Sequence, residues 1–486
     1  MTPQIILAVF ILYTAFIFLV SVWASRKADN ESFFIGNRKS PWPVVAYGMI
    51  GTSLSGVTFL SVPGWVGSTH FTYLVMVIGY IAGYAVISTV LLPVYYRLKL
   101  TSIYTYLQQR FGPSSYKTGS SFFLLSRIIG ASFKMYLVVS VLQYFVFDHF
   151  KVPFWVSVVL FMIIIQLYTM KGGIKTIVWT DMVQTTFMLL AVVLTLGVVL
   201  HEMHTNFGDM WHRVWSSDYA QIVVSDVKSP QYFVKLFLSG MFIPIVMTGL
   251  DQDMMQKNLS CKNLKDAQKN MTLLSLILVP VNLVFLFLGA VLYFYAAHLN
   301  LPLPALSDQL FPEIAFGYLG ITGGLVFLVG LIAAAYSSAD SALTSLTTSL
   351  TIDIMGYDRK YAGNEKLLKE KRQWMHFVLT LILIFVIIGF RSINNRAIIA
   401  QLFTFAGYTY GPLLGLYGFG LFTNYKVKDR FVPIVALISP FMAYGVSRLL
   451  TWIFTGYQVG YEVLLLNGLI TFIGLFFLIN YKKDKL

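Results

Sequence analysis

The residues in this sequence best suited to chemistry are hydroxyls and one carboxylate within an apolar segment. The stretch reads "GLIAAAYSSADSALTSLTTSLTIDIM", and Asp340 is its first carboxylate. One helix face carries small and hydroxylated residues at helical spacing, namely Ala334, Ser337, Ser338, Ser341, Ser345 and Thr348. Hydroxyl, carbonyl and carboxylate oxygens are the ligands that a hard cation such as Na⁺ prefers. The same small residues would also let a neighbouring helix pack closely.

A second carboxylate lies in a similar setting. Asp181 occurs in "GGIKTIVWTDMVQTTFMLLAVVL", about one and a half turns inside an apolar run. A carboxylate in lipid is costly, so it usually faces a cavity, a cation or a positively charged partner. Because Asp181 and Asp340 are both predicted in the cytoplasmic half of the membrane, we expect them to share one site.

Composition shows what must position these residues. The chain has 486 residues, of which 57% are hydrophobic and only 12% are charged. The apolar residues form runs of about 20, the length of a helix that crosses roughly 30 Å of hydrocarbon. The sequence therefore predicts an all-α polytopic membrane protein with about thirteen transmembrane helices. These are expected at 3–24, 42–66, 71–96, 119–147, 153–170, 176–200, 231–250, 271–298, 318–350, 376–392, 398–422, 432–454 and 459–480.

The basic residues predict the orientation of these spans. If alternate loops are assigned to opposite sides, 26 of the 35 Lys and Arg residues fall on one side, among them Lys257, Lys262, Lys265 and Lys269 of a single loop. The other side holds only Lys151, Arg213, Lys228, Arg391 and Arg396. Since positive loops stay in the cytoplasm, we expect the N-terminus outside and the C-terminus inside the cytoplasmic membrane. The net charge of +14 is then a topology signal that needs no nucleic-acid partner.

The sequence lacks the motifs that would indicate several other classes of protein. The sequence contains no HExxH, P-loop or GxSxG motif, so we expect no enzyme. A lone cysteine, Cys261, excludes an internal disulfide framework. The external loop at 201–231 carries His201, His204 and His212, which are candidate zinc ligands without a thiolate. Its tryptophans suit either a lid or a loop that seeks the membrane interface.

Two of the predicted spans are interrupted by helix breakers. The second contains "YGMIGTSLSGVTFLSVPGW", where Gly48, Gly51, Gly56 and Pro63 surround Ser53, Ser55 and Thr58. The seventh contains "LSGMFIPIVMTGLDQD", with Gly240, Pro244 and Gly249. If the first span is an extra helix, the two interrupted helices are the first members of two successive five-helix units. Unwound helices at corresponding places in two halves indicate the substrate and ion sites of a secondary transporter.

Four ordered segments resemble the solute:sodium symporter family. They are "FFIGNRKSPWPVVAYGMIGTSLSG", "GGIKTIVWTDMVQ", "GLDQDMMQKNLSCKNLKDAQK" and "AAAYSSADSALTSLTTSLTIDI". The resemblance implies a single, monomeric transport domain over 1–486 with a LeuT-type inverted five-plus-five core. Its parts would be an extra helix at 3–24, repeats at about 42–250 and 231–422, and two C-terminal helices at 432–480.

The same resemblance implies Na⁺ sites and transport by alternating access. The first sodium site would use backbone oxygens of Gly51, Leu54 and Ala334 and the hydroxyls of Ser337 and Ser338. A second cation site, found in some members, would use Asp181, Ser337, Asp340 and Ser341. Members with that site generally have Ser or Thr where this chain has Asp340. Two carboxylates there would bind two cations, or one of them would carry a proton.

The solute is less constrained than the ion. The resemblance, especially to the sialic acid transporters, implies substrate contacts at Ser53, Ser55, Thr58 and Arg127, with Lys134 two turns beyond. The third span shows no counterpart of the glutamine that binds their substrate. We expect sodium-coupled import of a small polar solute, either an organic anion or an acidic sugar such as a sialic acid. The alternatives are a neutral sugar or polyol, with Arg127 paired to a protein carboxylate, and a substrate-sensing receptor.

Overall fold

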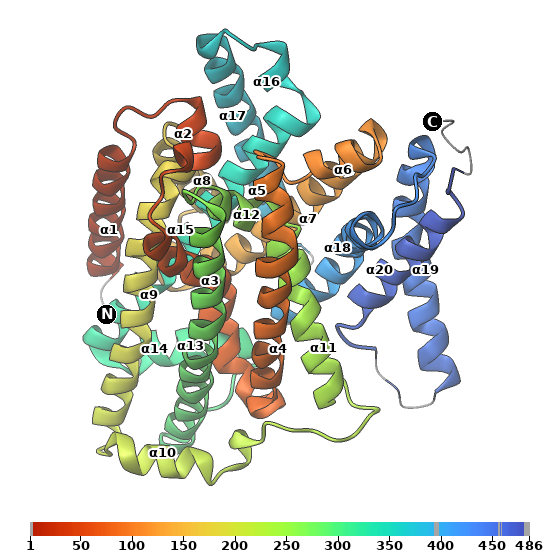
Figure 1. The fold of residues 1–486 in the computed structure, drawn as a ribbon. Helices are drawn as coiled ribbons and strands as arrows, with labels where there is room; N and C mark the ends of the chain where they lie inside the picture. The colour runs from red at the N-terminus through yellow and green to blue at the C-terminus, as the bar shows by residue number, and fades with distance from the viewer. Residues whose placement is uncertain (1–2, 393–397, 455–456, 458, 481–486) are drawn as a thin grey trace.

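The computed structural model describes residues 3–392, 398–454, 457 and 459–480 (Figure 1). Each of the thirteen predicted spans coincides with a helix or with two helices joined end to end. In chain order these are α1 (Pro3–Ala24), α3 (Trp42–Thr69), α4 (Tyr73–Val86) with α5 (Leu92–Arg97), α7 (Pro113–Leu142), α8 (Phe154–Thr169), α9 (Ile174–Glu202), α11 (Phe233–Pro244), α13 (Leu264–His298), α15 (Gly320–Ser349), α17 (Glu365–Phe390), α18 (Ile398–Phe422), α19 (Val432–Ile453) and α20 (Val463–Phe476). The shorter helices are α2 (Asn30–Ile35), α6 (Thr105–Arg110), α10 (Phe207–Trp215), α12 (Gln252–Leu259), α14 (Leu310–Gly317) and α16 (Tyr357–Lys360). Of the residues used in the charge count, Arg396, Lys482, Lys483 and Lys485 lie outside the described ranges.

Length and hydropathy support a protein that crosses the membrane many times. Within the described ranges, eight helices are long and apolar enough to span a bilayer. A ninth span results if Phe233–Gly249 and Gln252–Leu259, which meet at an angle of 66°, are taken together. The helices Phe154–Thr169 and Val463–Phe476 are apolar but shorter. The chain is therefore a multi-pass, all-helical membrane protein, and the number thirteen stays a prediction.

Both predicted interruptions are confirmed by the backbone. In α3, Ser55 has φ 54° and ψ 173°, a conformation that cannot continue a helix. The helix α11 passes into a wider turn at Ile245–Gly249, and the chain then bends sharply into α12. A helix that is broken in this way releases carbonyl and amide groups from its own hydrogen-bond ladder. These groups become available to ligands at the two breaks.

Small residues let the neighbouring helices approach the break in α3, which packs against α9, α13 and α15. At Gly51, a Cβ atom would lie 2.2 Å from the Thr185 hydroxyl of α9. At Gly48, it would lie 2.9 Å from the Cβ atom of Asp181. Any larger residue at these two positions would push α9 away. The glycines of α3 therefore bring Asp181 to the broken helix.

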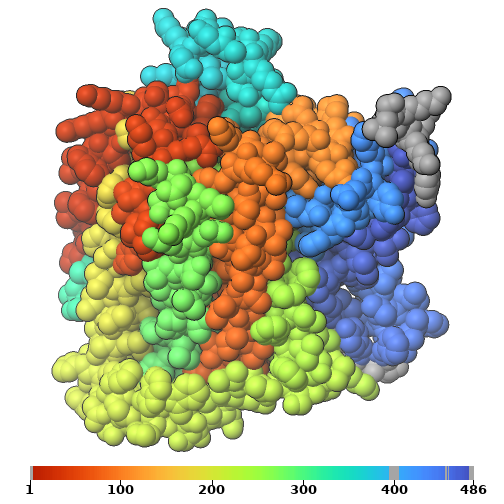
Figure 2. Space-filling model, viewed as in Figure 1, coloured from red at the N-terminus to blue at the C-terminus, as the bar shows by residue number. Residues whose placement is uncertain are grey.

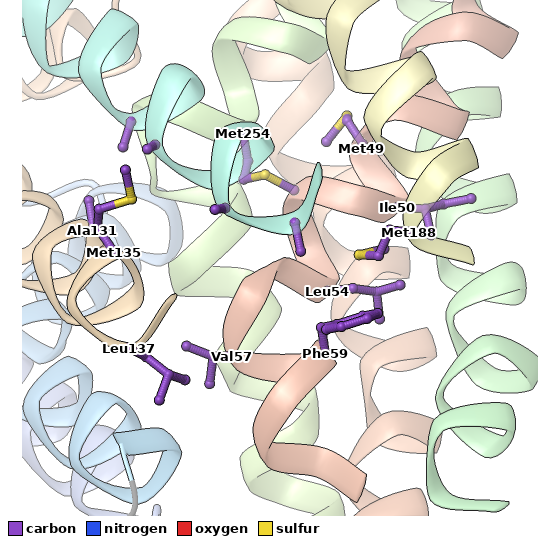
Figure 3. Close-up of a cluster of buried hydrophobic side chains, with 14 of the residues drawn as sticks. Met49, Ile50, Leu54, Val57, Phe59, Ala131, Met135, Leu137, Met188 and Met254 are labelled. Carbon is purple, nitrogen blue, oxygen red and sulfur yellow. The ribbon is translucent and has the colours of Figure 1, made fainter. Parts of the chain in front are cut away.

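Apolar side chains surround the break and keep bulk water away from it. Figure 3 shows ten of them, labelled Met49, Ile50, Leu54, Val57 and Phe59 of α3, Ala131, Met135 and Leu137 of α7, Met188 of α9 and Met254 of α12. All of these are buried. In so apolar a setting, electrostatic interactions between the few polar groups are stronger than in water.

The long loop at 201–231 is itself structured. Its helix α10 lies across one end of the molecule (Figures 1 and 2), with the Trp215 ring 5.8 Å from the Phe71 ring. The Trp211 ring lies 5.6 Å from Phe287 of α13. Both tryptophan rings thus contact other aromatic rings of the protein, while the Trp211 side chain is 38% exposed. Among the described residues no three His, Cys, Asp or Glu side chains are placed to hold a metal ion.

Candidate functional site

The residues predicted for the first sodium site lie where the break in α3 meets α15. The hydroxyl of Ser337 is 3.3 Å from that of Thr52, which joins the two helices. The Ser338 hydroxyl is buried and has no hydrogen-bond partner among the described residues. An unpaired buried hydroxyl is costly, and a bound cation would satisfy it. Together with the carbonyls of Gly51 and Leu54 beside the break, this oxygen-rich set suits Na⁺.

Asp181 is the centre of a dense buried network. Its carboxylate accepts hydrogen bonds from Ser337 at 2.7 Å and from Thr52 at 3.1 Å. The ammonium group of Lys257 donates to Asp181 Oδ2 at 2.6 Å and to the Thr52 hydroxyl at 2.5 Å. Asp181 and Lys257 are each only 1% exposed. The network joins α3, α9, α12 and α15 through one ion pair.

The position of Lys257 corrects the sequence analysis, which counted it among the basic residues of a cytoplasmic loop. The sharp bend after α11 turns α12 back into the protein, so its residues Gln252–Leu259 are all buried. Lys257 therefore places a positive charge in the interior of the protein. It does not count toward the positive loop charges that predict the orientation in the membrane. The remaining loop lysines still lie on the same predicted side.

The four residues predicted for the second cation site do not all converge. Asp181 and Ser337 are in contact, as described above. Asp340 instead accepts hydrogen bonds from the Tyr168 hydroxyl at 2.8 Å and from the Ser341 amide at 2.6 Å. The Ser341 hydroxyl donates to Asp253. Asp340 and Ser341 thus each have a protein partner other than Asp181.

Arg127 pairs with carboxylates of the protein. Its guanidinium group contacts Asp253, and its Nη1 atom lies 3.8 Å from Asp251 Oδ2. Asp251 also accepts a hydrogen bond from the Tyr410 hydroxyl. Asp251 and Asp253 are fully buried and begin α12 at the second break. This is the arrangement that the sequence analysis linked to a neutral solute.

A cavity of about 100 Å³ lies between the two breaks. Four residues predicted to contact the solute line it together, namely Ser53, Ser55, Thr58 and Arg127. Its wall also includes Lys134 of α7 and three tyrosines of α4, Tyr73, Tyr80 and Tyr84. The lining contains no Asp or Glu among the described residues. Lys134 makes no hydrogen bond or ion pair within the part of the chain that the structure describes.

Sequence reasoning missed several residues of this site. Thr52, Asp251, Asp253 and Lys257 were not singled out, although they complete the buried network. A signal was available, because "GLDQDMMQK" places three charges within nine residues directly after a predicted break. Charges so close to an apolar span are expensive unless they are paired inside the protein.

Comparison with known proteins supports the geometry. The sequence pattern of the sodium:solute symporter family matches residues 33–424. The sodium/sialic acid symporter of Aliivibrio fischeri is 23% identical, covering 92% of this chain and 90% of that protein. The sodium-coupled monocarboxylate transporter 1 of Mus musculus is 25% identical, covering 81% of this chain and 64% of that protein.

A solved structure shares the fold. It is a substrate-bound, outward-open sodium-coupled sialic acid symporter, with a TM-score of 0.84 and 20% sequence identity. The superposition covers 97% of this chain and 96% of the other. The two broken helices, the hydroxyl-rich face of α15 and the match over residues 33–424 lead to one conclusion: this chain belongs to the sodium:solute symporter family, whose members couple solute transport to Na⁺.

Proposed function

We propose that this symporter imports a small organic anion, such as a monocarboxylate or an acidic sugar, by alternating access. The observation that carries the proposal is the cavity beside Ser55, whose wall includes Arg127 and Lys134 and no described carboxylate. Arg127 is already paired with Asp253, whereas Lys134 has no such partner. An ammonium group that lines a cavity without a hydrogen-bonded counter-ion favours an anionic ligand. Lys134 is therefore the proposed anion contact, and Arg127 shapes the site behind it.

The named relatives support an anionic solute. One of them is a symporter of sialic acid and the other of monocarboxylates. Both solutes carry a carboxylate. The hydroxyls of Ser53, Ser55 and Thr58 and the tyrosines of α4 would bind the rest of such a molecule.

The break in α3 supplies the coupling between ion and solute. The carbonyls of Gly51 and Leu54 precede Ser55, and Ser55 and Thr58 face the cavity. A Na⁺ ion held by Gly51, Leu54, Ala334, Ser337 and Ser338 would fix the conformation of the break. It would thereby orient the solute-binding hydroxyls, so that each ligand strengthens the binding of the other.

A neutral sugar or polyol is the second candidate, and one observation favours it. The guanidinium group of Arg127 lies between Asp251 and Asp253, so it has little need of a carboxylate from the solute. In that case the unpaired group at Lys134 would act as a hydrogen-bond donor to a sugar hydroxyl.

Uptake into proteoliposomes separates these candidates. We expect uptake only with an inward Na⁺ gradient, and we expect carboxylates to compete while their amide isosteres do not. Lys134→Met should remove that discrimination, Lys134→Arg should retain it, and the exposed-loop control Lys262→Met should behave as wild type. Equal competition by a carboxylate and its amide in the wild type would favour the neutral solute. Binding without any uptake would favour a receptor.

The placement of the chain in its membrane is also part of the proposal. We place it in the cytoplasmic membrane as a monomer with thirteen spans, the N-terminus outside and the C-terminus inside, and without catalytic conversion of the solute. The extra first helix, the two five-helix repeats and the C-terminal helix pair are proposed with the limits given above. Reporter fusions at Ser216 and at the C-terminus should report opposite sides of the membrane, and reporters on the same side would contradict the topology.

A further inference from the structure

We propose that the ammonium group of Lys257 takes the place of a sodium ion at Asp181, so that this symporter binds a single Na⁺. The predicted second cation site includes Asp181 and Ser337. In the structure, Lys257 Nζ lies 2.6 Å from Asp181 Oδ2 and 2.5 Å from Thr52 Oγ1. A positive charge is thus already in contact with two oxygens from two different helices.

The ion pair with Lys257 leaves Asp181 with no uncompensated charge to attract a second ion. Asp181 and Lys257 are both 1% exposed, and together they are neutral. A Na⁺ ion added at Asp181 would lie about 4 Å from the ammonium charge, and at an effective dielectric constant of about 20 the repulsion would weaken binding about a thousandfold. The pair therefore excludes the cation that an unpaired Asp181 would attract.

The backbone holds Lys257 firmly in this position. The Tyr96 hydroxyl donates to the carbonyl of the next residue, Asn258, at 2.8 Å. The side chain of the preceding residue, Gln256, donates to the Phe34 carbonyl at 2.6 Å and to the Thr348 hydroxyl at 2.8 Å. The helix α12 is thereby tied on both sides of Lys257. Its ammonium group is a fixed part of the site.

The other predicted ligands of the second site are engaged as well. The Ser341 hydroxyl donates to Asp253, and Asp340 accepts from Tyr168. By contrast, the Ser338 hydroxyl of the first site has no partner in the described part of the chain. The Ser338 hydroxyl of the first site is thus available to Na⁺, whereas at Asp181 the protein supplies the cation itself.

Binding of radioactive Na⁺ to the purified protein, without any solute, tests this assignment. We expect one Na⁺ per wild-type chain. Lys257→Gln should expose the Asp181 carboxylate and raise the count to about two per chain, with a Hill coefficient above about one. Lys257→Arg and the double variant Lys257→Gln/Asp181→Asn should each bind one. Because no solute is present, the outcome does not depend on the proposed organic anion.

The controls keep the test decisive. Lys262→Gln removes an exposed lysine from the nearby loop and should leave the count at one. If Lys257→Gln does not fold, the wild-type count still decides, because one Na⁺ per chain supports the proposal. Two Na⁺ per wild-type chain, or an unchanged count in a folded Lys257→Gln variant, would overturn it.

Discussion

The two broken helices differ in the kind of polar group that they expose. The break in α3 at Ser55 carries uncharged groups, namely the hydroxyls of Ser53, Ser55 and Thr58 and nearby carbonyls. The break between α11 and α12 is followed within eight residues by Asp251, Asp253 and Lys257. Ligands are expected at the first, whereas the charges of the second are paired with Arg127 and Asp181.

This difference has a physical reason. A surface that binds and releases its ligands in every cycle must be able to return to water, and hydroxyls and carbonyls do so at small cost. Charged groups in an apolar interior are destabilising whenever they lose their partners. The charged break is therefore suited to a part of the protein that keeps its contacts throughout the transport cycle. The uncharged break is suited to the surface that binds and releases ligands. The following predictions test that distinction.

The largest effect is expected at the charged break. Asp253→Ala leaves Arg127 without its closest carboxylate, and breaking such a buried pair costs about 3–5 kcal/mol. Thermal unfolding of the detergent-purified protein should show a much lower midpoint. Arg127→Met in the same chain should recover part of the loss, and Glu370→Ala, on an exposed face of α17, should have little effect. A midpoint like that of the wild type in Asp253→Ala would show that this break tolerates an unpaired charge.

A smaller effect is expected at the sodium ligands. Ser338→Ala removes an unpartnered hydroxyl from a packed face that tolerates alanine, so folding should be preserved. Loss of one ligand of a charged ion should raise the half-saturating Na⁺ concentration for uptake by about tenfold. The matched control is Ser345→Ala, because that hydroxyl donates to the Ala342 carbonyl of its own helix. Equal Na⁺ dependence in the two variants would show that the serines on this face of α15 serve helix packing and do not bind Na⁺.

The backbone of the uncharged break should affect the stability of the protein by a comparable amount, about 1–3 kcal/mol. The φ of 54° at Ser55 lies in the region that favours glycine, and such strain costs on the order of 1–3 kcal/mol. Ser55→Gly should preserve or raise the unfolding midpoint, whereas Ser55→Val should lower it. At Ser61, in the helical part of α3 after the break, glycine should instead destabilise by roughly 0.5 kcal/mol. The same response at both positions would mean that Ser55 is not strained.

The smallest effect is expected for the chemical reactivity of Cys261, which follows α12. This thiol is fully buried, and burial raises its pKa to about 12. The reactive thiolate is therefore scarce at pH 8, and alkylation should be slow with and without Na⁺ and become faster only as the pH rises. Cys261→Ala/Ser216→Cys supplies an exposed thiol as the reactive control. Labelling of Cys261 that is rapid without Na⁺ and slow with Na⁺ would show that α12 moves during transport.

Much of the fold could be predicted because membrane spans are local features of the sequence. The expected first span at 3–24 coincides with α1, Pro3–Ala24, and the other spans match helices to within a few residues except at α7, α13 and α17, whose helices begin earlier. Both breaks were also expected, since Gly and Pro act on the helix that contains them. The length of an apolar run and the presence of a helix breaker can be read without knowing any neighbour.

The partners of the buried charges were decided by tertiary structure alone. Asp181 pairs with Lys257 at a separation of 76 residues, and Arg127 pairs with Asp253 on another helix. Both pairings follow from the 66° bend that returns α12 to the interior. The sequence shows that a carboxylate inside an apolar span needs a partner, because an isolated charge there is unstable. Which cation it receives depends on the path of the chain through space, and that path is set by the packing of all the helices together.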